Sequence, residues 1–185
     1  ELIKYLKSLE ATKSIFLVTN GQEPDMIQKL QDEDALPTQL YLSTNAADYE
    51  SFIKINKPKY DDSWERWNRT LDMLKNLDTR TVLRITLIRD YNDQKEMIPA
   101  FADMFRKASP HFIEIKSYMH IGRSTNRLEH ENMLEMHEVK KFSEQIAKQS
   151  KIFSVMDESL VSRISILQNN ERFIDRYIPT YANTN

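Results

Sequence analysis

The chain has 185 residues, of which 40% are hydrophobic and 29% are charged, and its formal net charge is −2. This is the composition of an ordinary globular domain, and it excludes a protein that is basic over its whole surface. With no cysteine, the chain can form no disulfide, zinc–thiolate site or iron–sulfur ligand, and its two glycines exclude a glycine-rich phosphate loop. No apolar run approaches the roughly 18 residues needed to span a bilayer, and no secretory-signal pattern is visible, so we expect a cytoplasmic location without membrane contact.

Hydrophobic periodicity predicts alternating helices and strands. Helices are predicted over residues 1–12, 24–33, 47–55 and 94–108, with a longer one after Asp61 or Asp62. Strands are predicted over residues 14–19, 38–43, 81–88 and 111–117. After Ser124 the pattern changes to an amphipathic helix over residues 132–149 and an edge hairpin from residues 151–156 and 163–167.

The order of these elements predicts an α/β fold in which helical crossovers join four parallel strands. Right-handed crossovers would curve the sheet into part of a barrel or leave it doubly wound, and both forms gather ligands at the carboxyl ends of the strands. We divide the chain into this β/α unit (1–125), an extension of a helix and short strands (126–168) and a polar tail (169–185). Because four strands alone leave a sheet edge exposed, we interpret the chain as the later part of a larger domain.

Two of the predicted strands carry charge among apolar residues. Arg84 and Thr86 alternate with leucine and isoleucine in one strand, and Glu114 and Lys116 do so in the other. Strands under covering helices are normally apolar on both faces, so this charged face must pair internally, line a cavity or face water. A buried ion pair stabilises little unless it is well hydrogen-bonded, and an arginine in a cavity suits a carboxylate or phosphate. An internal ion-pair network and a ligand pocket both remain open at this point.

Two groups of basic residues lie far apart in the sequence. Lys54, Lys57 and Lys59 form the first group, and Arg123 and Arg127 lie in a loop-like stretch that forms the second. Each group is either a solvated surface or a contact site for phosphate.

Aromatic and histidine residues near these groups have simpler interpretations. Trp64 and Trp67 share one helix face and are predicted to be core residues rather than stacking platforms for a base. His111, His130 and His137 have no carboxylate partner at ligand spacing, so we expect them to be structural or on the surface.

Several segments follow one another in an order that resembles one enzyme family. They are Phe16–Gly21 (FLVTNG), Pro37–Ser43 (PTQLYLS), Trp64–Arg66 (WER), Arg80–Arg89 (RTVLRITLIR), Tyr91–Asn92 (YN), Ile113–Gly122 (IEIKSYMHIG) and Ser124–Leu128 (STNRL). This ordered set is similar to the radical S-adenosylmethionine (SAM) enzymes of wybutosine biosynthesis, the 4-demethylwyosine synthases, in their archaeal, flavodoxin-free form. The resemblance covers roughly residues 1–167.

The resemblance implies a parallel partial β/α barrel of the radical SAM type, of which this chain would hold strands three to six with a C-terminal helix and edge strands. It also implies [4Fe–4S] clusters, cleavage of SAM with electrons from an external donor, and condensation of pyruvate-derived carbons with N1-methylguanosine in phenylalanine tRNA. The Cys-x3-Cys-x2-Cys cluster loop and the Gly-Glu-Pro motif of such enzymes would precede Glu1. Without cysteine, this chain is expected to hold no metal and to be inactive alone.

The resemblance assigns no catalytic residue but implies three sets of binding residues. They are Thr19, Asn20, Gly21, Ser43, Asn45, Arg84 and Thr86 for SAM, Glu114, Lys116 and His120 for the substrate side, and Lys54, Lys57, Lys59, Arg123 and Arg127 for tRNA phosphates. Asn45 stands where relatives often have aspartate, so its role follows less directly. The alternatives are another radical SAM enzyme that acts on a small molecule and a non-catalytic β/α anion-binding module.

Overall fold

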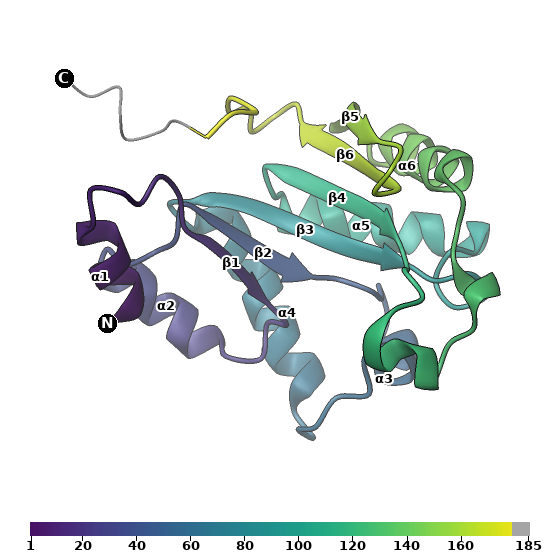
Figure 1. Ribbon diagram of the computed structural model, residues 1–185, viewed down its shortest axis with the longest axis horizontal. Coiled ribbons are helices and arrows are strands. Elements are labelled where there is room, and N and C mark those ends of the chain that lie inside the picture. Colours follow the sequence, from purple (N-terminus) through teal and green to yellow (C-terminus); the bar gives the residue numbers. More distant parts are fainter. Residues whose placement is uncertain (179–185) are drawn as a thin grey trace.

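A computed structural model describes residues 1–178 of the chain, and it shows one six-stranded sheet with helices on one of its faces (Figure 1). The strand order across the sheet is β1-β2-β3-β4-β6-β5. The strands are β1 (Phe16–Thr19), β2 (Gln39–Ser43), β3 (Arg80–Leu87), β4 (Phe112–Ser117), β5 (Phe153–Ser159) and β6 (Ile164–Asn169). The sheet is mixed, because β1 to β4 run parallel whereas β6 pairs antiparallel with both β4 and β5.

Helices join the parallel strands, as the predicted α/β pattern requires. The α-helices are α1 (Leu2–Ser8), α2 (Pro24–Asp32), α3 (Tyr49–Asn56), α4 (Ser63–Met73), α5 (Ile98–Ala108) and α6 (Met136–Ser150). The short 3-10 helices are η1 (Leu74–Asn76), η2 (Lys95–Met97), η3 (Gly122–Asn126) and η4 (His130–Asn132). The four parallel strands, their helical connections and the terminal hairpin are therefore confirmed.

Three helix boundaries were predicted wrongly. One is the start of α5, where residues 95–97 form the 3-10 helix η2 and the α-helix begins at Ile98, not at residue 94. The first helix ends at Ser8, not at residue 12, because Leu9 is already in an extended conformation. The last helix begins at Met136, not at residue 132, because Glu135 and Glu138 cap its start reciprocally. Such a capping box satisfies backbone N–H groups that a helix start leaves without partners.

The core lies between the sheet and the helices α4, α5 and α6, which are behind the sheet in Figure 1. Alternate strand residues point into it, among them Leu40, Leu83 and Ile113, each fully buried. Trp67 is also buried, and its ring stacks on Trp64 at 5.3 Å with an interplanar angle of 18°. The core interpretation is confirmed for Trp67, whereas Trp64 is half-buried and packs against the core.

The other face of the sheet, which the helices do not cover and which we call the inner face, carries the polar strand residues. Cross-strand neighbours share a face, and the register aligns Ser43, Arg84 and Glu114 across β2, β3 and β4. Thr86 and Lys116 are paired one step further along. The inner face is therefore the charged face that the sequence predicted.

At the amino end of the strands, polar side chains bind other parts of the chain. His111 Nδ1 accepts a hydrogen bond from the Thr81 backbone N–H at 3.1 Å, which confirms a structural histidine. Asn169 is fully buried, and its side chain makes four hydrogen bonds that tie the end of β6 to the start of β4 and to the segment that follows. Arg80 donates to the carbonyl groups of residues 175–177. Residues 179–185 of the predicted polar tail lie outside the described residues.

Candidate functional site

Two asparagines organise the carboxyl ends of β2 and β3. Asn92 is fully buried, and its side-chain amide donates to the carbonyl groups of Asn45 and Thr86, both at 2.9 Å. Its Oδ1 accepts from the Ile88 backbone N–H at 2.7 Å. The Asn45 side chain accepts from the Thr86 N–H at 3.0 Å. The two side chains therefore hold the strand ends in a fixed geometry, and a pocket forms beside them.

The pocket has a volume of about 450 Å³ and lies between the ends of β1 and β2 and the α3–α4 loop. It is lined by Asn20, Gln22, Ser43, Asn45, Phe52, Ile55, Asn56, Lys57, Pro58, Lys59, Tyr60, Ser63 and Arg127. In this volume range a pocket accommodates a nucleotide-sized ligand. We call it the strand-end pocket.

The α3–α4 loop forms the outer wall of the strand-end pocket because of its local sequence. Lys57 adopts the left-handed conformation (φ 46°), which ends α3, and Pro58 prevents the helix from continuing. Ser63 then starts α4, and its hydroxyl donates to the Tyr60 carbonyl at 2.6 Å. The loop is thus a defined turn that presents Lys57, Lys59 and Tyr60 toward the pocket.

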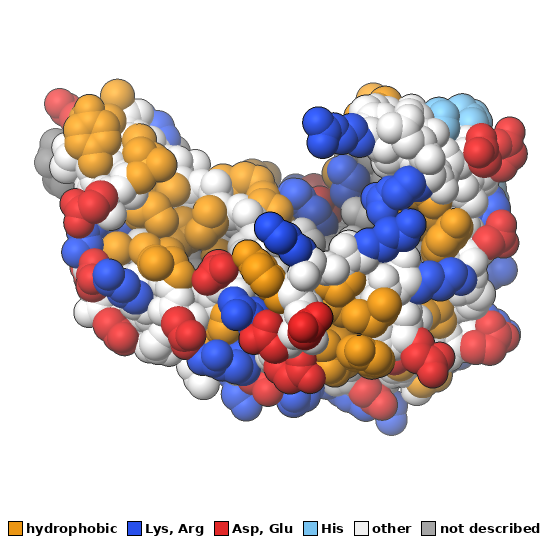
Figure 2. All heavy atoms as spheres, turned by 90° about the horizontal axis from the view of Figure 1, so that it is seen from below, with side chains coloured by type: hydrophobic (Ala, Val, Ile, Leu, Met, Phe, Trp, Pro, Cys, Tyr) orange, Lys and Arg blue, Asp and Glu red, His pale blue; other side chains and the backbone are white. Residues whose placement is uncertain are grey.

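The pocket brings together basic residues that are distant in the sequence. Lys57 and Lys59 from the first basic group and Arg127 from the second line the same cavity. All three are exposed, and none forms an ion pair or a side-chain hydrogen bond with another residue in the described part of the chain. Figure 2 shows Lys and Arg side chains gathered beside a hollow on one face of the molecule. An anionic ligand would find cations there that are not already neutralised by acidic partners.

Gln22 is a pocket residue that sequence reasoning missed. Its side-chain amide donates to the Ser63 carbonyl at 3.0 Å, which leaves Oε1 buried without a donor among residues 1–178. A buried acceptor without a partner is costly, and a ligand N–H or O–H group would satisfy it. Asn56 and Ser63 were missed as well, whereas Tyr60 was noted only as a neighbour of the lysines that could stack on a base. Asn56 directly precedes Lys57 in the sequence, so its position beside the basic group was the available signal.

Not every predicted SAM residue lines the strand-end pocket. Gly21 has φ +76°, and a Cβ atom there would lie 2.7 Å from Leu42 Cδ1. Its N–H donates to Thr19 Oγ1, and its carbonyl accepts from Thr70. Thr19 and Gly21 thus shape the loop that carries Asn20 and Gln22.

The charged pair on the inner face is an ion pair. Arg84 Nε lies 2.7 Å from Glu114 Oε1, and the two side chains are 25% and 9% exposed. The Arg84 guanidinium also stacks over the Tyr41 ring at 4.6 Å. Burial and the nearby Glu114 carboxylate raise the pKa of Tyr41. Arg84 is therefore held by Glu114 and Tyr41 on the inner face, and it does not line the strand-end pocket.

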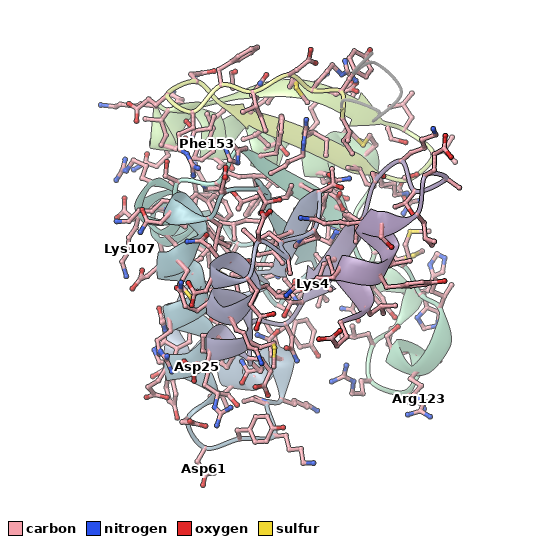
Figure 3. The ribbon with its side chains drawn as sticks, turned by 90° about the vertical axis from the view of Figure 1, so that its left-hand side faces the viewer. Lys4, Asp25, Asp61, Lys107, Arg123 and Phe153 are labelled. Carbon is pink, nitrogen blue, oxygen red and sulfur yellow. The ribbon has the colours of Figure 1, made fainter. Side chains whose placement is uncertain are left out.

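A loop between β4 and α6 completes this end of the molecule. Within it, the Tyr118 hydroxyl lies 3.1 Å from His120 Nδ1. Arg89 braces the loop at its base, since it contacts both carboxylate oxygens of Glu138 at 2.6 and 2.7 Å and donates to the Met133 carbonyl. Hydrogen bonding to Arg89 holds the pKa of Glu138 below its usual range. His120 lies outside the strand-end pocket, and Arg123 extends away from the body of the molecule (Figure 3).

Two further features concern metals and membranes. Among residues 1–178 there is no group of three or more His, Cys, Asp or Glu side chains placed to hold a metal ion. The same part of the chain contains no helix with the length and hydrophobicity that crossing a membrane requires.

Comparisons with known proteins agree with the resemblance seen in the sequence. The family described as wyosine base formation matches residues 107–169. The chain is 37% identical over 156 residues to the S-adenosyl-L-methionine-dependent tRNA 4-demethylwyosine synthase of Pyrococcus abyssi, which covers 84% of this chain and 45% of that enzyme. It is 41% identical over 162 residues to the enzyme of the same name from Methanocaldococcus jannaschii, covering 86% of this chain and 48% of that enzyme.

A solved structure shares this fold. The structure of TYW1 with a lysine–pyruvate adduct bound superposes with a TM-score of 0.75 at 40% identity, over 86% of this chain and 48% of that one. The chain thus spans about half the length of each of these three relatives. It is a homologue of tRNA 4-demethylwyosine synthase, and it corresponds to the C-terminal part of that enzyme.

Proposed function

We propose that this chain is the SAM- and tRNA-facing part of a radical SAM enzyme of the 4-demethylwyosine synthase type. In that function, pyruvate-derived carbons are condensed with N1-methylguanosine in phenylalanine tRNA, and an external donor supplies the electrons. The observation that carries the proposal is the strand-end pocket, where Lys57, Lys59 and Arg127 meet the polar strand ends. Homology to a SAM-dependent tRNA-modifying enzyme supports the same assignment.

The strand ends are the proposed SAM side of the partial barrel. Asn20, Ser43 and Asn45 line the pocket, and the buried Gln22 Oε1 is an acceptor for an amino or hydroxyl group of the ligand. Because a ligand that satisfies Gln22 replaces a missing hydrogen bond, these residues fit a nucleoside such as the adenosyl part of SAM. Thr19 and Gly21 support SAM binding indirectly, through the shape of their loop.

The inner face of the sheet is the proposed substrate side. Glu114 and Lys116 are on that face, and Arg84 and Thr86 stand beside them on β3. The ion pair with Glu114 fixes the Arg84 guanidinium, so a substrate carboxylate would meet a positioned rather than a mobile cation. His120 belongs to the same side, beyond the end of β4.

The residues present do not fit a [4Fe–4S] cluster. Such clusters are held by cysteine thiolates, and this chain has no cysteine. The part proposed for this chain is to bind SAM and tRNA and to orient them.

RNA binding tests the proposal. The site variant replaces Lys57, Lys59 and Arg127 by alanine, and the control variant replaces Lys13, Lys75 and Lys148, which are exposed lysines outside the pocket with no ion-pair partner in the described residues. Both variants change the net charge equally, so a purely global charge effect would be the same in each. Fluorescence anisotropy with tRNA containing N1-methylguanosine measures the affinity over a range of salt concentrations.

We expect the site variant to bind tRNA at least about tenfold more weakly and to lose about two to three units of the salt slope. The control variant should stay close to the wild type. Equal losses in both variants, or no tRNA binding by the wild type, would contradict the tRNA assignment.

A further inference from the structure

The loop that follows β4 has an exposed apolar tip. Ile121 is 70% exposed and Met119 is 38% exposed, and they stand directly before the 3-10 helix η3. We call residues 119–127 the tip loop. It lies at the opposite end of the molecule from α1 in Figure 1.

Hydrogen bonds within the tip loop order its backbone although its side chains are exposed. The Ser124 hydroxyl donates to the Ile121 carbonyl at 2.6 Å, and the Thr125 hydroxyl donates to the Gly122 carbonyl at 2.8 Å. The backbone N–H of Leu128 closes the turn on the Ser124 carbonyl at 3.0 Å. A surface that is already ordered loses little conformational entropy when it binds a partner.

The base of the tip loop is anchored as well. Arg89 Nε donates to the Glu131 carbonyl at 2.9 Å, and the backbone of Arg89 is joined to Asn132 in both directions. The buried Leu128 packs with Ile88 below the loop. These contacts fix the direction in which the tip points.

The tip loop also carries the two arginines that have no partner. Arg123 and Arg127 are the only arginines in residues 1–178 whose side chains form neither an ion pair nor a hydrogen bond. Every other arginine is bound to a carboxylate or to a backbone carbonyl, as Arg89 and Arg163 illustrate. Two available guanidinium groups and an exposed isoleucine therefore belong to the same short loop.

An exposed aliphatic side chain and cations within one loop fit a general mode of nucleic-acid binding. An apolar wedge can enter between bases, while arginines bind the phosphates on either side. RNA loops offer such sites because their bases are already partly unstacked. Arg127 is shared with the strand-end pocket, so an RNA held by the tip loop would also reach that pocket.

We propose that the tip loop is an RNA-inserting wedge, in which Ile121 enters between unstacked bases of an RNA loop while Arg123 and Arg127 contact the neighbouring phosphates. The proposal rests on the proposed tRNA function and adds the contact that would open the RNA loop next to the pocket. Ile121 acts by shape and the two arginines act by charge, so the two contributions can be measured separately.

The experiment uses the whole chain and an anticodon stem-loop RNA with 2-aminopurine in the loop, next to the N1-methylguanosine. The test variant is Ile121→Ser, and the matched control is Leu2→Ser on α1, because Leu2 is 69% exposed. Arg123→Ala reports on the phosphate contact. Thermal unfolding of each variant verifies that the fold is retained, which we expect because the replaced side chains are exposed.

We expect wild-type binding to raise 2-aminopurine fluorescence as the base unstacks. Ile121→Ser should remove this rise and weaken binding by about tenfold with an unchanged salt slope. Arg123→Ala should lower the salt slope by about one unit, and Leu2→Ser should behave as the wild type.

Two results would overturn the wedge, and they are distinguishable. If RNA binding requires Lys57 and Lys59 but Ile121→Ser retains both affinity and the fluorescence rise, only the wedge fails, and the tip serves another partner or none. If the wild type binds no RNA, the tRNA function fails together with the wedge.

Discussion

The two ends of the parallel strands use polar residues in opposite ways. At the amino end, polar side chains form hydrogen bonds with other residues of the chain, as His111, Asn169 and Arg80 do. At the carboxyl end, Lys57 and Arg127 are exposed and without a partner among the described residues. The paired residues lie in or directly next to strands, whereas Lys57 and Arg127 lie in loops.

This difference separates stability from binding. A buried polar group must be paired, because leaving it unpaired costs about 1–3 kcal/mol, whereas an exposed cation is already solvated by water. Residues at the amino end should therefore affect folding, and the exposed residues at the carboxyl end should affect ligands. The carboxyl end also contains buried residues, such as Asn92 and Gly21, and these should affect folding as the amino-end residues do.

The largest effect should come from the amino end. Asn169→Ala removes four side-chain hydrogen bonds at a fully buried position, and we expect it to lower the free energy of unfolding by about 3–4 kcal/mol. Urea unfolding measures this. Asn76→Ala, at an exposed position, should change stability by less than about 0.5 kcal/mol. Similar values for the two variants would break the comparison.

The two glycines compare a buried position with an exposed position at the carboxyl end. Both have positive φ, but a Cβ at Gly21 would meet Leu42 at 2.7 Å, whereas a Cβ at Gly122 meets nothing within 4 Å. We expect Gly21→Ala to cost about 2–3 kcal/mol and Gly122→Ala about 1 kcal/mol, because only the first adds a steric clash to the backbone strain. Equal costs in urea unfolding would show that packing around Gly21 is looser than described.

His111 should give the amino end a dependence on pH. Burial, with the charges of Arg172 and Arg80, lowers the pKa of His111 to about 4, below its usual 6.5. The unfolded chain therefore binds a proton between these values that the folded chain does not, so stability should fall as the pH drops from 6.5 to 4. His111→Asn keeps an acceptor for Thr81 and should reduce this fall. An unchanged pH profile in the urea midpoint would argue against a neutral, buried imidazole.

The smallest effect on folding should come from the exposed residues at the carboxyl end. Arg123 is exposed and has no partner in the described part of the chain, so Arg123→Ala should change the free energy of unfolding by less than about 0.5 kcal/mol. A larger decrease in the free energy of unfolding, measured by thermal or urea unfolding, would show that Arg123 contributes to stability. The contrast between the two ends would then not hold.

Much of the fold followed from local patterns. Period-two alternation located the strands, and helical spacing placed Trp64 and Trp67 on a buried face. The helix ends were less predictable, since Glu135 and Glu138 cap α6 through side-chain bonds that periodicity does not reveal. The roles proposed for individual SAM, substrate and tRNA residues remain predictions.

The candidate site followed only in part. Asn20, Ser43 and Asn45 were expected at strand ends, and they line the pocket. Gln22 was missed, because its unpartnered oxygen results from the bond that its amide makes to Ser63, far along the chain. Nothing in the local sequence reports such a bond.

The sequence by itself determined which segments become helices and strands, and which strand face carries charge, because these depend on side chains two to four positions apart. Only the tertiary structure decided that Arg84 pairs with Glu114, and that Lys57 and Arg127 share one pocket. Those outcomes depend on strand register and on where loops end after long crossovers. Contacts between distant segments are set by the packing of the whole sheet, and no short stretch of sequence contains that information.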